Sequence, residues 1–110
     1  MITKRLADDA IAAHLRKVER EMDLFGSALP ENRDRPTHQL VITNVTEHEF
    51  GWVYFYNSRE FVESGEALHA LAGNAPLIVA RTDCKLYSTG TAQPIEHYVE
   101  EFRSGRRHPL

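Results

Sequence analysis

The first part of the chain carries apolar residues at a helical spacing. They recur every three or four positions, at Ile11, Leu15, Val18, Met22 and Phe25. This spacing places them on one face of a helix, with charged side chains on the opposite face. Thr3 is a suitable N-cap and Gly26 a suitable end. The pattern predicts a long amphipathic helix that covers a sheet.

Two segments rich in β-branched and aromatic residues follow, at residues 40–46 and 50–56. Such residues are typical of strands. The three residues between them, 47–49, suit the turn of an antiparallel hairpin. Because side chains alternate along a strand, Trp52, Tyr54 and Tyr56 share one face, which we expect to be a core face rather than a stacking platform for bases.

The second half of the chain predicts two more strands and a final helix. Residues 77–80 and 85–88 read as strands joined by a turn at 82–84. A helical stripe follows, at Ile95, Tyr98, Val99 and Phe102. The fold class expected is therefore α+β: an antiparallel four-stranded sheet covered by an N-terminal and a C-terminal helix, both on one face.

The length of 110 residues suits a single domain, 1–110. Residues 26–37 contain two prolines and no periodicity, so we expect a flexible loop there. Residues 104–110 form a short basic end that we expect to be frayed.

Composition and charge exclude several classes of function. There are 13 basic and 16 acidic residues, a net charge of −3, whereas a dedicated nucleic-acid binder would carry a basic excess. No apolar run could span a membrane, and acidic residues follow the N-terminus before any signal-like segment, so a cytoplasmic location is expected. The acidity is concentrated: residues 38–103 contain four basic and nine acidic residues, a net charge of −5.

The search for catalytic or metal-binding patterns gives none. Cys84 is the single cysteine, which excludes an internal disulfide and a zinc site of four cysteines. Six histidines are scattered without metal-ligand spacing, and no phosphate-binding glycine loop is present. We therefore expect no catalytic residues, no metal, no cofactor and no enzyme activity. A Cys84-dependent enzyme remains an alternative that Cys84→Ser would test.

Several short motifs in order resemble a known family. They lie at residues 51–52, 59–61, 71–79 and 90–94, where the last two read LAGNAPLIV and GTAQP. Here the chain resembles the YrhB-like family of bacterial polymorphic-toxin immunity proteins, immunity protein family thirty-five. The loop at 26–37 is longer than is usual there. Cys84 stands where the family tends to have glycine, a turn position that often requires a positive φ.

The resemblance implies a small cytosolic α+β protein that binds and neutralises a cognate toxin domain by direct, non-enzymatic inhibition. It also implies an alternative, a chaperone-like or housekeeping protein without a dedicated toxin. Because toxins that act on nucleic acids tend to have cationic grooves, charge alone suggests an acidic contact set. Its members are Glu47, Glu49, Glu60, Glu63, Glu66 and Asp83. Aromatic residues on an edge strand would allow a homodimer without requiring one.

Overall fold

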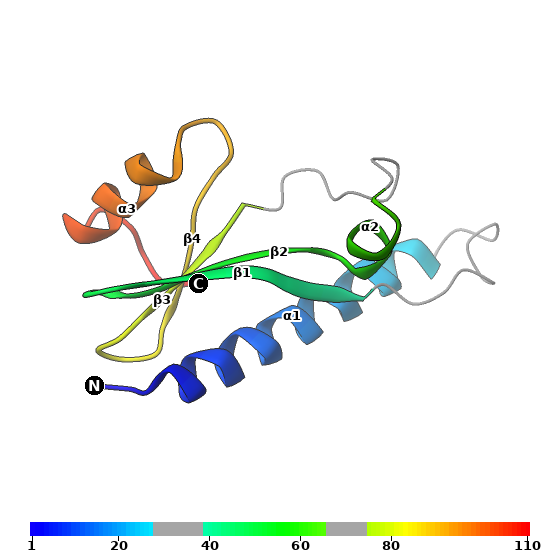
Figure 1. Cartoon of the computed structure of the whole chain (residues 1–110), viewed down its shortest axis with the longest axis horizontal. Coiled ribbons are helices and arrows are strands. Elements are labelled where there is room, and N and C mark those ends of the chain that lie inside the picture. Colours follow the sequence, from blue (N-terminus) through cyan, green and yellow to red (C-terminus); the bar gives the residue numbers. More distant parts are fainter. Residues whose placement is uncertain (28–38, 66–74) are drawn as a thin grey trace.

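The computed structural model describes residues 1–27, 39–65 and 75–110, and for residues 23–27 it describes the main chain (Figure 1). The elements, in order, are α1 (Lys4–Ser27), β1 (Leu40–His48), β2 (Gly51–Ser58), α2 (Arg59–Ser64), β3 (Leu77–Ala80), β4 (Leu86–Ser88) and α3 (Ile95–Arg103). Nearly all of the loop expected at 26–37 lies outside the described residues, as does Glu66; the helix itself continues one residue past Gly26.

The four strands form one antiparallel sheet in the order β1-β2-β3-β4. With a helix before it and a helix after it, this sheet confirms the predicted α+β fold class. The first hairpin is tighter than expected. Glu47 and His48 belong to β1 and pair with Trp52 and Gly51, so the turn is Glu49–Phe50 and the three-residue turn predicted at 47–49 is wrong.

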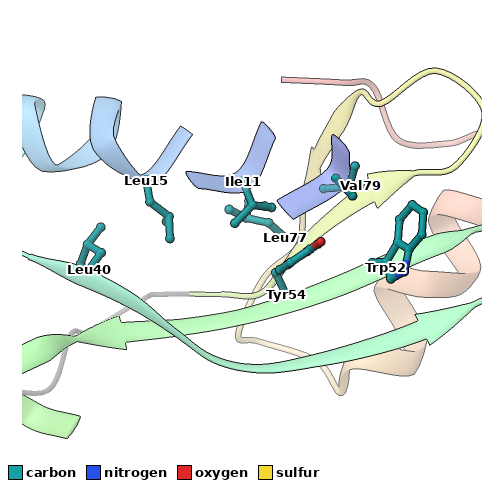
Figure 2. Close-up of a cluster of buried hydrophobic side chains, with 8 residues drawn as sticks. Ile11, Leu15, Leu40, Trp52, Tyr54, Leu77 and Val79 are labelled. Carbon is teal, nitrogen blue, oxygen red and sulfur yellow. The ribbon is translucent and has the colours of Figure 1, made fainter. Parts of the chain in front are cut away.

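The main core lies between α1 and one face of the sheet (Figure 2). Its buried residues are Ala7, Ile11, Leu15, Leu40, Trp52, Tyr54, Leu77 and Val79. Tyr56 is partly buried against them. The predicted core face of Trp52, Tyr54 and Tyr56 is thus confirmed. Thr3 caps the helix as expected, since its Oγ1 accepts a hydrogen bond from the Leu6 N–H at 3.3 Å.

The helix α3 lies on the opposite face of the sheet from α1 (Figure 1). Val53 pairs with Ile78, and Ile78 with Tyr87, so these three side chains share the face that does not carry Trp52. The Phe102 ring of α3 packs against the Tyr87 ring, with the ring centres 4.8 Å apart. The expectation that both helices cover one face is therefore wrong. Trp52 and Val53 are each 1% exposed, so β2 is covered on both faces.

Two further elements differ from the sequence prediction. The short helix α2 was not predicted; the Ser58 Oγ accepts from the Phe61 N–H at 3.1 Å, and Gly65 ends the helix with a φ of 71°. Residues 104–110, expected to be frayed, make specific contacts. The Arg107 guanidinium lies 4.9 Å from the Tyr98 ring centre, and the Leu110 N–H donates to the Leu86 carbonyl at 2.8 Å.

Candidate functional site

The sheet has two ends, and the predicted acidic residues divide between them. Glu47, Glu49 and Asp83 lie where the β1–β2 and β3–β4 turns meet, which we call the turn end. Glu60 and Glu63 lie on α2, which follows the opposite end of β2. Because β2 spans seven steps of about 3.3 Å, the two groups are separated by roughly 23 Å of strand. They are two separate surfaces.

Glu47 is held at the turn end by Arg81. The carboxylate accepts from the Arg81 Nη2 at 2.9 Å, and Nη2 also donates to the His48 carbonyl at 2.8 Å. The guanidinium lies 4.3 Å from the Trp52 ring centre, so a buried aromatic fixes its position. The Glu47 side chain is 61% exposed and that of Arg81 only 20%. The result is an outward carboxylate on an anchored support.

Glu49 is held in a similar way by Arg103 of α3. Their Oε1 and Nη2 atoms are 3.2 Å apart, and the Arg103 guanidinium lies 5.2 Å from the Phe50 ring centre. Phe50 in turn stacks on His48, with the ring centres 4.9 Å apart. The Glu49 side chain is 81% exposed. An ion pair this exposed contributes little to stability, but it limits the directions that the carboxylate can take.

Asp83 is fixed by its own turn. Its Oδ1 accepts from the Lys85 backbone N–H at 3.0 Å, a local bond typical of aspartate in turns. At the α2 end, Glu63 lies 4.0 Å from Arg59 and is 71% exposed. Glu60 is exposed as well. At the turn end, Glu47 and Glu49 are both held by arginines from other parts of the chain that rest on aromatic rings.

Arg81 and Arg103 were missed as site residues by sequence reasoning. The acidic set rests on charge alone, and a charge count does not show which arginines pair with which carboxylates. The signal that identifies Arg81 lies in the strand register, which neither segment of the sequence shows alone. Since Ala80 pairs with Gly51, and Glu47 pairs with Trp52, Arg81 has to emerge close to Glu47.

Cys84 occupies the turn between β3 and β4 with a φ of 63°, the left-handed region. Its Sγ donates to the Leu6 carbonyl at 3.7 Å, and the side chain packs against the α1 core. This confirms the sequence argument that the position requires a positive φ.

We predict that Cys84→Gly is more stable than Cys84→Ala by about 1 kcal/mol. Both variants lose the thiol, but only glycine removes the cost of a left-handed backbone. Urea unfolding of the two variants side by side measures the difference. Equal stabilities would mean that this turn does not hold residue 84 at a positive φ.

A hydrogen bond between side chains links Asp8 of α1 to Tyr54 of the buried strand β2. The Tyr54 hydroxyl donates to the Asp8 Oδ1 at 2.6 Å. Burial raises the pKa of Asp8, but the hydrogen bonds from Tyr54 and Lys4 outweigh it and leave the pKa below its ordinary value. Burial and the Asp8 carboxylate raise the pKa of Tyr54 well above its ordinary value.

Tyr54→Phe is expected to lower the free energy of unfolding by about 1 kcal/mol at neutral pH, since Asp8 is 46% exposed and can turn to water. The lowered pKa of folded Asp8 stabilises the protein above the unfolded pKa of about 3.9 and is lost as pH falls through the folded value. The difference between wild type and Tyr54→Phe should therefore shrink in acid. Tyr87→Phe, on the other face, serves as the control; a difference that does not change with pH would contradict the Asp8 assignment.

Among the described residues, no group of three or more His, Cys, Asp or Glu side chains is arranged to hold a metal ion. No described helix is both long and apolar enough to cross a membrane. What the described surface offers is a set of positioned carboxylates, which suits contact with another protein.

Comparison with known proteins assigns the chain to a protein family. The family model described as Immunity protein 35 matches residues 10–103, a range that runs from α1 to the last residue of α3. The uncharacterized protein YrhB of Escherichia coli (strain K12) is 38% identical over 63 residues, which cover 57% of this chain and 67% of that protein. No solved structure matches. On the extent of the family match, the chain belongs to the Immunity protein 35 family.

Proposed function

We propose that this chain binds a toxin domain of a bacterial polymorphic toxin system and neutralises it by direct, non-enzymatic inhibition in the cytoplasm of the producing cell. Membership of an immunity-protein family over residues 10–103 is the observation that carries the proposal. The absence of a metal-holding group among the described residues is compatible with action by contact, without itself supporting it.

We place the toxin contact at the turn end. The proposed acidic set of Glu47, Glu49, Glu60, Glu63, Glu66 and Asp83 lies within a stretch of net charge −5. One flat partner surface would cover one end of the sheet more readily than both. The turn end is favoured because Arg81 and Arg103 already hold Glu47 and Glu49, so little side-chain freedom is lost on binding. The partner that fits is a domain with a cationic groove, and opposite charges would speed the encounter.

The test is co-expression with the C-terminal domain encoded by the neighbouring upstream gene. Growth should be restored, and the two chains should purify together as a stable complex. A toxin domain from a different system, expressed in the same way, is the specificity control and should remain toxic. Toxicity without rescue, or the failure to form a complex, would contradict the immunity proposal and favour the chaperone-like alternative.

A further inference from the structure

The strand β1 is an edge of the sheet, and at Leu40 its main chain faces away from the sheet. The Arg59 N–H donates to the Gln39 carbonyl at 2.9 Å, which makes Gln39 and Arg59 a hydrogen-bonded pair. In an antiparallel ladder the next pair, Leu40 with Ser58, is then the non-hydrogen-bonded kind. The N–H and C=O of Leu40 therefore point outward, where an added strand would bind.

Both outward groups of Leu40 are occupied by side chains of α1. The Glu19 Oε2 accepts from the Leu40 N–H at 2.6 Å, and the Arg16 Nη2 donates to the Leu40 carbonyl at 2.8 Å. Arg16 and Glu19 also bind each other, with Nε and Oε1 2.8 Å apart. The Glu19 carboxylate thus accepts from the Leu40 N–H, and the Arg16 guanidinium donates to the Leu40 carbonyl. A neighbouring strand would supply the same two partners, one acceptor and one donor.

This arrangement is partly buried. Leu40 is 2% exposed and the Glu19 side chain 13%, so without the pair the Leu40 main chain would lose both partners in a place that water reaches poorly. Two residues further along, the register with β2 shifts between Ile42 and Asn44, a β-bulge. Bulges and charged side chains are both means by which proteins protect sheet edges from pairing with other chains.

We propose that Arg16 and Glu19 act as a guard of the β1 edge: their side chains take the place of a neighbouring strand at Leu40 and so prevent a second copy of this chain from pairing there. The inference is independent of the toxin proposal, because it concerns association of the chain with itself. It assigns to one exposed and one partly buried residue of α1 a role in keeping the β1 edge closed.

The test compares Arg16→Ala/Glu19→Ala with a matched control, Lys17→Ala/Glu21→Ala. The control removes one basic and one acidic side chain from exposed positions of the same helix. Sedimentation velocity over a concentration series should show self-association of the first variant strengthened at least tenfold over wild type, and no change in the control. Adding Ile42→Lys, which places a charge on an exposed edge position, should reverse the association.

A purely structural role for the pair predicts a different result. The Arg16→Ala/Glu19→Ala variant would then melt at a lower temperature and stay as monomeric as wild type, and this outcome would overturn the guard. Association that Ile42→Lys leaves unchanged would also overturn it. If the double variant does not fold, Glu19→Ala alone decides: its Leu40 amide should exchange at least tenfold faster and its self-association should rise, and faster exchange without association rejects the proposal.

Discussion

Replacing Gly51 with alanine is expected to lower the free energy of unfolding by about 3 kcal/mol or more. Gly51 has a φ of 147°, and a Cβ there would overlap the Val79 carbonyl oxygen and lie 3.0 Å from the Arg81 nitrogen. Both are main-chain atoms of the neighbouring strand region. Backbone strain and steric overlap in a packed site each cost roughly 1–3 kcal/mol. Urea unfolding monitored by circular dichroism measures the loss.

The neighbouring ladder leaves little room for relief. Gly51 pairs with both His48 and Ala80, and the Arg81 N–H donates to the Phe50 carbonyl at 2.9 Å. The matched control is Gly65→Ala, where φ is 71° but nothing lies within 4 Å of the added carbon. That variant should lose only about 1 kcal/mol, the usual cost of a left-handed residue. Similar small losses at both positions would contradict the close approach of β3 to Gly51.

The sequence predicted those parts of the fold that rest on local periodicity. The stripe through Ile11 and Leu15 predicts α1, because a helix packed on one side repeats its apolar residues every three to four positions. Alternation along β2 likewise predicts which face carries Trp52 and Tyr54. These signals are contained within one element, so they need no knowledge of its neighbours.

Two wrong predictions, the face that α3 covers and the position of the first turn, depend on contacts between different elements. The run WVYFY of β2 is apolar without interruption, which is typical of a strand covered on both faces. A strand of this kind needs cover on its Val53 face as well as on its Trp52 face, and α3 provides that cover. The turn was misplaced because Glu47 and His48 look like turn residues, and only the pairing with Trp52 and Gly51 shows that they are strand.

The sequence predicts which acidic residues are candidates for the site, but it does not predict which of them lie together on one surface. Charge counts select Glu47 and Glu63 equally, although one lies in β1 near its turn and the other on α2 beyond the far end of β2. The supporting Arg81 lies 34 residues from Glu47 along the chain, so its partnership depends on the order of the strands. Long-range pairing of this kind is set by the register and is not visible in either segment alone.

Reversing the charges at the turn end is expected to weaken toxin binding about 100-fold. The variant Glu47→Lys/Glu49→Lys/Asp83→Lys places three positive charges opposite a cationic groove, and a loss of about 1 kcal/mol per exposed charge gives that factor. Titration calorimetry or surface plasmon resonance measures the affinity. Much of the loss should lie in the association rate, and the wild-type rate should fall with added salt more steeply than that of the variant.

The matched control reverses charges at the other end, with Glu60→Lys/Glu63→Lys on α2. This change is expected to alter the affinity by less than about tenfold, since long-range attraction is screened over roughly 10 Å at moderate salt. Arg81 and Arg103 lose their partners in the turn-end variant, so its melting temperature has to be measured with its affinity. A stable turn-end variant with unchanged affinity would exclude this end as the contact. A loss confined to the α2 variant would move the contact to the far end of the sheet and leave the immunity proposal intact.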